Sequence, residues 1–523
     1  MLPLIRSLTF VKKYYKNTYG VYQLRYTSTK MTQWKPTIGL EIHAQIATES
    51  KLFSGASTNF SSPINSCVSL FDSAVPGTMP VLNKKCVEAG VLTALALSCD
   101  VNAVSLFERK HYFYSDQPAG YQITQQKKPL ASNGEINFMV FTPGVHKEPY
   151  LKSSKIKQIQ LEQDSGRSLH SEHHGRSLID LNRAGVPLME LVFEPDLADG
   201  EEAAALVKEL SIILQTLGTC SCKMEEGALR VDANVSLSRP DEPLGTRTEL
   251  KNIGSIRAVW NAVEQEIKRQ ISILEAGGKI VNETRAWDPD RKETILMREK
   301  EDNHDYRFMP ETNLPPLRLH VNKDAENKYN LINVSSIKET LPELPEQIRQ
   351  TLTESGLEPR RIYNLMSNLE LLELYRYILN NGENRTPSLI GHFLLHEIVG
   401  FLQHNNLEFQ FCVTNREYLD ELFDLLQRKM INYHTLKKIL KNKLVEPNKM
   451  PKQIVEENNW FMIWDERELE KLCLDVLEKN PKLVKKYKAG KMKVFKNILH
   501  EVMKVTECAD MAQVTKIMTR LLK

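Results

Sequence analysis

The chain has 523 residues, with 69 lysines and arginines against 66 aspartates and glutamates and a formal net charge of +3. Hydrophobic residues make up 41% and charged residues 26%, the composition of a globular protein of about three domains. No apolar run reaches the ~18 residues that a membrane-spanning helix needs. Eight cysteines are scattered without regular pairing, and Cys220 and Cys222 stand too close together for a zinc knuckle, so we expect reduced thiols in a reducing compartment.

The first 33 residues form a basic segment that contains no acidic residue. Seven lysines and arginines precede Glu41, the first carboxylate of the chain, and hydroxyl-bearing residues are frequent among them. A disordered basic arm would have a similar composition, but so long a stretch without an acid is more typical of a mitochondrial transit peptide. We therefore predict that residues 1–33 are a transit peptide and that the protein resides in the mitochondrial matrix.

Residues 34–325 show the pattern of a domain that mixes strands and helices. Short alternating runs of apolar and polar residues are separated by turns marked with glycine and proline. Helical patterns interrupt them at 83–99, 200–218 and 255–278. We predict an α+β fold in which 34–325 is a catalytic domain built on a largely antiparallel sheet with flanking helices.

From about residue 335 onward nearly every pattern is helical. We predict an all-helical domain at 326–450 and a small helical tail domain at 451–523. Residues 482–523 contain eleven lysines and arginines against three acids, and the segment "KYKAGKMK" forms a loop between two predicted helices. A solvated helical face explains many charge runs, but so large an excess beside an acidic middle favours a surface for nucleic acid.

The stretch "WKPTIGLEIHAQIAT" predicts a strand with one apolar and one polar face, the polar face carrying Glu41 and His43. Three further runs, 155–163, 228–238 and 246–252, place carboxylates, amides and cations on one side in the same way. A single wet face is common in antiparallel sheets. Aspartate and asparagine are poor strand formers, however, and four such strands together favour a polar cradle that binds a ligand.

The predicted cradle carries side chains that suit a hard divalent cation and phosphate oxygens. The candidate cation ligands are Glu41, His43, Glu162 and Glu226. Oxygen ligands with a single imidazole nitrogen are typical of Mg²⁺ or Mn²⁺ rather than zinc, and the cations Arg230, Arg247 and Lys251 suit phosphate. The combination indicates nucleotide-dependent phosphoryl transfer, although no Walker A motif is present.

These residues lie in blocks that resemble one family, the B subunits of glutamyl-tRNA(Gln) amidotransferases. The blocks are "IGLEIHAQIATESKLFSGAS", "PGTMPVLNKK", "FERKHYFYSDQPAGYQIT", "LEQDSGRSLH", "LIDLNRAGVPLMELV", "KMEEGALRVDANVSL", "GTRTELKNIGS" and "DYRFMPETNLPPL". They follow the family's order and spacing over essentially the whole chain after the leader. With its transit-like leader, the chain is similar to the mitochondrial form.

The resemblance implies one component of a three-subunit carbon–nitrogen ligase that converts Glu-tRNA(Gln) to Gln-tRNA(Gln) in mitochondrial translation. In this family the B subunit uses ATP and Mg²⁺ to phosphorylate the side-chain carboxylate of the tRNA-linked glutamate. An amidase A subunit supplies ammonia from glutamine, and a small C subunit holds the other two together. The competing hypothesis is a non-catalytic RNA-binding module that presents Glu-tRNA to a partner.

The resemblance also implies roles for individual residues. It makes His43, Glu162 and Glu226 metal ligands, with Glu41 beside them, and it adds Lys251 to complete the expected catalytic set. The joint presence of these five residues favours the enzyme over the non-catalytic module.

Other matched positions are expected to contact the nucleotide or the acyl group. Arg230 and Asn252 are the candidates on the strands, and Tyr112 and Asp116 lie in a block that resembles the family's active-site lining. For Tyr112 an ordinary aromatic core contact beside a turn is the alternative. Gln163 stands where many bacterial members have a second carboxylate, which argues against a second metal.

The basic tail resembles the family domain that contacts the body of the tRNA. The candidate phosphate contacts are Lys485, Lys486, Lys488, Lys491 and Lys493. We expect these contacts to follow the shape and charge of the RNA rather than its base sequence.

Overall fold

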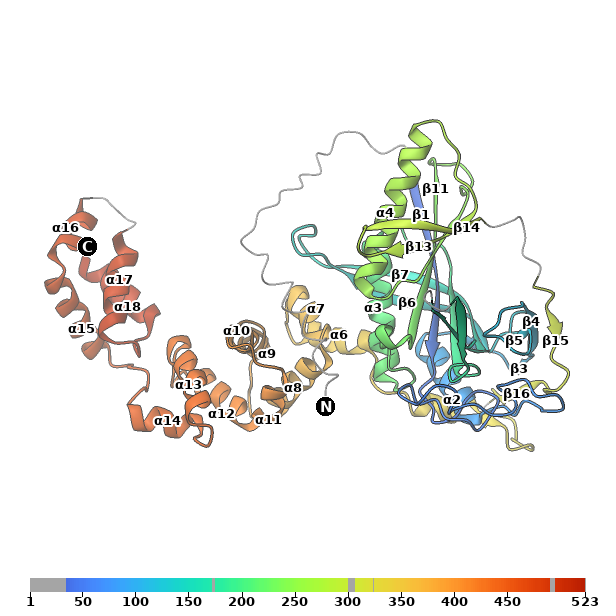
Figure 1. The fold of residues 1–523 in the computed structure, drawn as a ribbon. Helices are drawn as coiled ribbons and strands as arrows, with labels where there is room; N and C mark the ends of the chain where they lie inside the picture. Colours follow the sequence, from blue (N-terminus) through green and yellow to red (C-terminus); the bar gives the residue numbers. More distant parts are fainter. Residues whose placement is uncertain (1–33, 172–174, 300–305, 323, 490–493, 523) are drawn as a thin grey trace. The chain divides into compact units, whose positions relative to one another are not determined.

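The computed structural model describes residues 34–171, 175–299, 306–322, 324–489 and 494–522. This part of the chain divides between Ile348 and Arg349 into two compact units. The first is rich in strands and the second is helical, which confirms the predicted fold class (Figure 1). The predicted transit peptide, residues 1–33, lies outside the described residues.

The first unit extends beyond residue 325, where we placed a domain boundary. β17 (Ile332–Asn333) pairs in parallel with β16 (Leu317–His320), and α5 (Val334–Glu339), which follows it, packs against α2 (Lys84–Ala96). These contacts join the segment up to Glu339 to the sheet-containing unit. The predicted boundary at 451 is not addressed by this division and stays a prediction.

The first unit is organised around a nine-stranded sheet with the order β14-β13-β12-β11-β1-β10-β7-β6-β2. Its strands are β1 (Lys35–Gln45), β2 (Asp100–Val101), β6 (Ala131–Val140), β7 (Tyr150–Gln163), β10 (Pro187–Phe193), β11 (Leu229–Ser238), β12 (Thr248–Lys251), β13 (Glu283–Asp288) and β14 (Glu293–Glu299). Among these described strands, β12 and β13 run in parallel and the other neighbours are antiparallel.

The central strand β1 has the alternation that its sequence predicts. Ile38, Leu40 and Ile42 are 0% exposed, whereas Glu41 and His43 lie half-buried on the opposite face. Each buried apolar side chain stabilises the fold by roughly 1.5–3 kcal/mol relative to an exposed one. Because a slip of one residue would exchange the two faces, this burial also fixes the register of the polar side chains.

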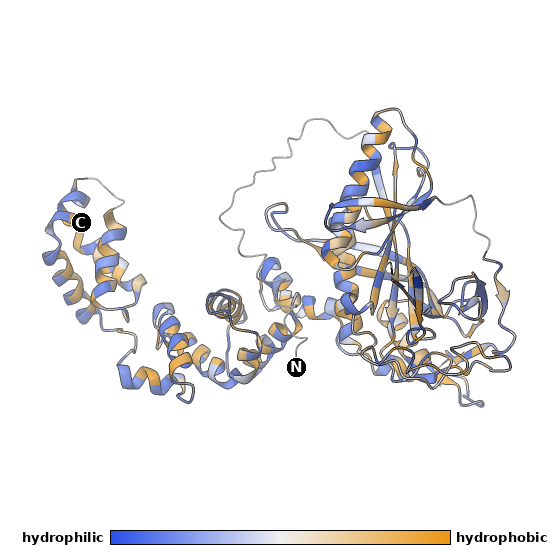
Figure 2. Ribbon diagram, in the orientation of Figure 1, coloured by the Kyte–Doolittle hydropathy of each residue, from blue (hydrophilic) through white to orange (hydrophobic). Residues whose placement is uncertain are grey.

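Three helices cover the apolar face of the sheet: α2, α3 (Gly200–Thr216) and α4 (Ile256–Glu275). Their N-cap residues Asn83, Asp199 and Ser255 each accept a backbone N–H of the first turn, which satisfies a donor that would otherwise lack a partner. The long α4 is amphipathic, and Figure 2 shows orange and blue residues along it. They correspond to the three helical patterns predicted for this part of the sequence.

A small sheet with the order β15-β4-β5 covers part of the polar face. It consists of β4 (Glu108–His111), β5 (Tyr121–Thr124) and β15 (Met309–Pro310). Gln122 Nε2 donates to the Gln163 carbonyl at 2.8 Å, and Gln160 Nε2 lies 3.2 Å from Thr124 Oγ1, so β5 lies against β7. The polar face is therefore partly enclosed rather than fully wet.

Further short strands complete the first unit. β3 (Val104–Ser105) joins β16 and β17 in a three-stranded sheet, and β8 (Arg167–Ser171) and β9 (Arg176–Asp180) form a hairpin.

The second unit is built from short amphipathic helices. They are α6 (Pro345–Glu354), which begins just before the division, α7 (Pro359–Met366), α8 (Leu369–Asn380), α9 (Pro387–His392), the π-helical η3 (Phe393–Ile398), α10 (Val399–His404), α11 (Gln410–Thr414), α12 (Arg416–Gln427), α13 (Tyr433–Val445), α14 (Pro451–Asn458), α15 (Glu466–Lys479), α16 (Pro481–Lys488), α17 (Val494–Val505) and α18 (Met511–Leu522). Residues of α15, α17 and α18 form a separate small core. In the described part of the chain, no helix is long and apolar enough to cross a bilayer.

Candidate active site

Three neighbouring strands bring two carboxylates and an imidazole together on the polar face. His43 on β1 lies opposite Glu190 on β10, and Glu162 on β7 points to the same side one step further along. One ligand atom from each of the three residues lies within 4.8 Å of the other two, and His43 Nε2 is 3.9 Å from Glu190 Oε1. We call His43, Glu162 and Glu190 the acid–imidazole cluster.

The acid–imidazole cluster is largely buried, and burial dominates its electrostatics. Glu162 is 2% and Glu190 8% exposed. Burial raises the pKa of both carboxyl groups and lowers the pKa of His43, because each charged form loses hydration. Lys110 Nζ on β4 lies 3.8 Å from Glu162 Oε2, and this carboxylate raises the pKa of Lys110.

The donor set of this cluster fits a divalent cation. Glu162 Oε2 is buried and has no hydrogen-bond partner among the described residues, whereas Gln160 Nε2 donates to Glu190 Oε2 at 2.6 Å. Two neighbouring carboxylates that lack enough hydrogen-bond donors are stabilised by an added positive charge. Carboxylate oxygens with one imidazole nitrogen suit Mg²⁺ or Mn²⁺.

Of the four metal ligands predicted from the sequence, two lie in the acid–imidazole cluster and two lie elsewhere. His43 and Glu162 belong to it. Glu41 lies two residues before His43 on the same face of β1 and accepts a hydrogen bond from Asn234 Nδ2 at 3.2 Å. Glu226 lies in the short 3₁₀ helix η2 (Met224–Glu226), where its carboxylate is 3.0 Å from Lys223 Nζ, outside the cluster.

Glu190 is the residue that our sequence reasoning missed. It lies in "PLMELVF", which we treated only as part of a block that resembles the family. An acid inside so apolar a strand is itself a signal, because a buried carboxylate is costly unless it has a partner or a ligand.

Of the three predicted cationic residues, Arg230 lies on β11 and Lys251 on β12, on the other side of β1, whereas Arg247 is exposed and precedes β12. Lys251 Nζ is 2.5 Å from Asp232 Oδ2 and 3.3 Å from Glu249 Oε1. Burial opposes the charge of Lys251, but these two carboxylates outweigh it and raise its pKa. Asn252 follows β12 with a left-handed φ of 60° and an exposed side chain, so it marks the turn at the end of this strand.

Arg230 is oriented by a buried aspartate at the end of β7. Arg230 Nη2 donates to Asp164 Oδ1 at 3.0 Å, and Gln45 Nε2 donates to Asp164 Oδ2 at 3.3 Å. Asp164 is 2% exposed. Because Gln45 and Arg230 come from β1 and β11, this one carboxylate joins the ends of three strands.

The aromatic block contributes to the wall of the site. Tyr112 is half-buried, its ring centroid is 5.5 Å from that of Tyr114, and burial and the nearby charge of Glu162 raise its pKa. The Asp116 carboxylate accepts a hydrogen bond from Ser168 at 3.4 Å. A cavity of about 330 Å³ opens beside this block, and its lining residues include Gln117, Tyr121, Gln163, Asp164 and Gly185.

The predicted RNA-binding lysines are only partly described. Lys485, Lys486 and Lys488 lie on α16, and their side chains are exposed. Lys491 and Lys493 lie outside the described residues. Leu483 and Tyr487, on the other side of α16, pack against the small core of the tail. The three described lysines form what we call the α16 lysine surface.

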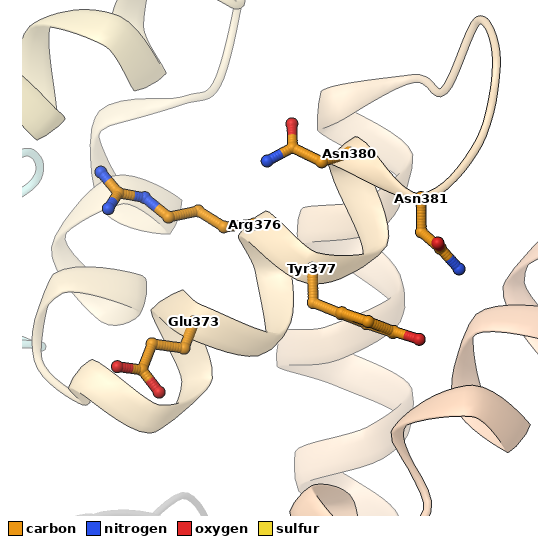
Figure 3. A pocket seen from close by; sticks show the side chains of 5 residues that line it. All are labelled: Glu373, Arg376, Tyr377, Asn380 and Asn381. Carbon is orange, nitrogen blue, oxygen red and sulfur yellow. The ribbon is translucent and has the colours of Figure 1, made fainter.

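A second hollow, of about 370 Å³, lies along α8 in the helical unit (Figure 3). It is lined by Glu373, Arg376, Tyr377, Asn380 and Asn381. The guanidinium of Arg416 lies 5.0 Å from the centroid of the Tyr377 ring, and Asn381 donates to Asp420. The hollow thus lies where two helices pack, and its lining lacks the convergent buried carboxylates of the acid–imidazole cluster.

Comparisons with known proteins agree with the resemblance seen in the sequence. Residues 36–324 match the family model described as the GatB/GatE catalytic domain, and residues 373–522 match the GatB domain. The B subunit of the mitochondrial glutamyl-tRNA(Gln) amidotransferase of Aedes aegypti is 53% identical over 501 residues, which cover 95% of this chain and 94% of the relative. Its human counterpart is 45% identical over 498 residues, with coverages of 94% and 89%.

A bacterial relative shows that the likeness is not confined to mitochondria. The B subunit of the aspartyl/glutamyl-tRNA(Asn/Gln) amidotransferase of Rickettsia canadensis is 39% identical over 484 residues, which cover 92% of this chain and 96% of the relative. The family comprises subunits of carbon–nitrogen ligases with glutamine as amido donor. From these matches over nearly its whole length, the chain belongs to the family of glutamyl-tRNA(Gln) amidotransferase B subunits, in its mitochondrial form.

Proposed function

We propose that this chain carries the ATP-dependent half of the amidotransferase reaction. It phosphorylates the side-chain carboxylate of glutamate on Glu-tRNA(Gln), and ammonia then displaces the phosphate to give Gln-tRNA(Gln) in mitochondrial translation. The observation that carries the proposal is the acid–imidazole cluster on three adjoining strands, with Arg230 and Lys251 on the next two strands of the same sheet.

The cluster is suited to hold Mg²⁺. His43, Glu162 and Glu190 would ligate the ion, and Glu41 lies beside them on β1. The bound ion offsets the negative charge of the nucleotide phosphates near the reacting carboxylate. In this proposal Arg230 and Lys251 contact phosphate oxygens, a role supported by their ion pairs with Asp164 and Asp232, which hold the two cationic groups in position.

Activation by phosphate explains why such a site needs so many charged groups. A carboxylate is a poor acyl donor because oxide is a poor leaving group, whereas phosphate leaves readily. Most of the catalytic work is then to position two anions and to neutralise the charge between them. The partial cover that β5 lays on the polar face lowers the local dielectric and strengthens these interactions.

The remaining steps need partners. An amidase subunit supplies ammonia from glutamine, and a small third subunit stabilises the heterotrimer, as the family resemblance implies. The α16 lysine surface contacts the tRNA backbone, together with Lys491 and Lys493, which follow it in the sequence. Residues 1–33 direct the chain to the mitochondrial matrix and are then removed.

The test is ADP release by the assembled complex in the presence of ATP and Glu-tRNA(Gln). His43→Ala should abolish ADP release, because His43 belongs to the acid–imidazole cluster. It should leave tRNA binding intact, because the lysines of the α16 lysine surface are not part of that cluster. His320→Ala, on β16 of the same unit, is the matched control and should release ADP at the normal rate. If the His43 variant released ADP normally, the chain would be a module that presents Glu-tRNA rather than the kinase.

A further inference from the structure

Cys220 and Cys222 form a pair of thiols on the connection between α3 and β11. The sequence "CSC" places a single residue between them, and in the described structure both are free thiols. Cys220 is 3% exposed, Ser221 is exposed and Cys222 is half-buried. Nothing in the proposed reaction uses either thiol.

The backbone of this connection folds Cys222 back onto Cys220. Cys222 has a left-handed φ of 55°, an uncommon conformation for a residue with a side chain. Its backbone N–H donates to Cys220 Sγ at 3.2 Å, and its thiol lies 3.8 Å from the Cys220 carbonyl oxygen. Gln215 Nε2 donates to the Ser221 carbonyl at 3.3 Å and holds the turn against the end of α3.

The acidities of the two thiols differ because each sulfur acts on the other. The nearby Cys222 lowers the pKa of Cys220, and the nearby Cys220 raises the pKa of Cys222. The backbone N–H of Cys222 adds to the stabilisation of a Cys220 thiolate. Cys222 is the more accessible sulfur and the one that a small disulfide can reach, although its raised pKa makes its thiolate scarce. Cys220 is shielded but more acidic, which suits it to the internal closure that follows.

From this geometry we propose that Cys220 and Cys222 form a reversible intramolecular disulfide by exchange with a low-molecular-weight disulfide such as glutathione disulfide. Cys222 sulfur, as thiolate, attacks the small disulfide, forms a mixed disulfide and releases one small thiolate. Cys220 thiolate then attacks Cys222 sulfur and displaces the second small thiolate. The two protons of the protein thiols are carried by the two released thiols, so one disulfide is consumed and one is formed.

The position of the pair connects this chemistry to the polar face. The Cys220 thiol donates to the Ala228 carbonyl at 3.4 Å, and the same carbonyl accepts the backbone N–H of Gln45 at 2.8 Å. Gln45 in turn donates to Asp164, which orients Arg230. Oxidation removes the S–H donor of Cys220, so we expect the junction between the end of β1 and the start of β11 to loosen.

Trypsin offers a direct test, because cleavage after Lys208 and Lys223 leaves both cysteines on one peptide, 209–223, that contains no other cysteine. The full chain is equilibrated in buffers of increasing ratio of glutathione disulfide to glutathione, quenched with acid, alkylated in denaturant and digested. We expect the 209–223 peptide to lose the mass of two hydrogen atoms and to escape alkylation. This should occur at a ratio at which less than about a tenth of the 505–516 peptide, with its single Cys508, carries glutathione.

The wild type and the two single-cysteine variants should give different products. Cys222→Ser should leave Cys220 reduced, and Cys220→Ser should leave Cys222 as a stable mixed disulfide with glutathione. A wild-type 209–223 peptide that stays reduced, or that carries glutathione without closing, overturns the proposal. Faster amide exchange of Gln45 in the oxidised protein is expected from the shared Ala228 carbonyl, and unchanged exchange would refute the connection to the polar face.

Discussion

Charged side chains occur in two contrasting settings in this protein, the polar face of the large sheet and the α16 lysine surface. On the sheet, Glu162 and Glu190 are buried and depend on a few fixed neighbours. On α16, Lys485 and Lys486 are exposed to solvent. Charges act strongly and at short range where water is excluded, but weakly and additively where salt screens them. Substitutions should therefore have large, position-specific effects in the first setting and small, cumulative ones in the second.

The largest effect should come from a buried ion pair close to the polar face. Lys51 Nζ lies 3.1 Å from Asp72 Oδ2, the two side chains are 0% and 1% exposed, and Ser54 also donates to Asp72. Lys51→Met should lower the free energy of unfolding by about 3–5 kcal/mol, because it leaves a buried carboxylate without its counter-charge. Urea unfolding of the full chain measures this.

The matched control for the buried pair is the double variant Lys51→Met with Asp72→Asn. Removing both charges should restore much of the stability that the single variant loses, since the main cost is the uncompensated charge. If both proteins unfolded at the same urea concentration, the loss would reflect packing of the lysine stem instead.

The next largest effect should come from Glu190, the cluster residue that the sequence reading missed. Glu190→Gln keeps the shape but removes one of two carboxylates, and we expect ADP release to fall by about 10²–10³-fold. Mn²⁺ binding, measured by the loss of free Mn²⁺ signal in electron paramagnetic resonance, should weaken in parallel.

The comparison with Glu226 decides between the sequence-derived ligand set and the observed cluster. Glu226→Gln should lose less activity and less Mn²⁺ affinity than Glu190→Gln, because its carboxylate lies against Lys223. The reverse order would show that η2 moves toward the site when the ligands bind.

A smaller effect is expected at Lys208, a shielded lysine on α3 that contrasts with the exposed lysines of α16. Burial lowers the pKa of Lys208 to about 8, with Glu209 opposing the shift. Between pH 8 and the ordinary lysine value of 10.5 the unfolded chain binds more protons than the folded one, so stability should rise with pH across this window. Lys208→Met should remove that rise and add about 1–2 kcal/mol of stability at pH 7.

The pH dependence at Lys208 has a simple control. Lys279→Met changes an exposed lysine that follows α4, and it should leave the slope of stability against pH unchanged. An equal change of slope in both variants would mean that net charge, rather than burial of Lys208, sets the pH dependence.

The apolar side of the fold was readable from the sequence because it follows from periodicity. Alternation in β1 and β11 predicted which residues are buried, and helical patterns that end at glycine or polar breaks predicted α2, α3 and α4. These patterns can be read from neighbouring residues alone, and burial of the apolar positions also fixes the register of the strands.

The composition of the cluster was harder to predict because it depends on which strands become neighbours. β1, β10 and β7 are adjacent in the sheet, but β1 is more than a hundred residues from the other two along the chain, so no local pattern pairs His43 with Glu190. Glu226 was included because it precedes a strand with the expected alternation, yet a turn residue can point to solvent or to its own neighbour. Here it contacts Lys223.

The smallest effect for each substitution is expected on the α16 lysine surface. Lys485→Gln, Lys486→Gln and Lys488→Gln should each weaken tRNA binding only a few-fold. Each should also reduce the slope of log affinity against log salt concentration by about 1, the value for one lost phosphate contact. Unfolding free energies should stay within about 0.5 kcal/mol of the wild type, because the side chains are exposed.

Lys338→Gln, an exposed lysine on α5, is the matched control and should change neither affinity nor slope. Weaker binding with an unchanged slope would mean that α16 supports the tail domain without touching phosphate, and the contrast between the two charged settings would then be one of structure alone.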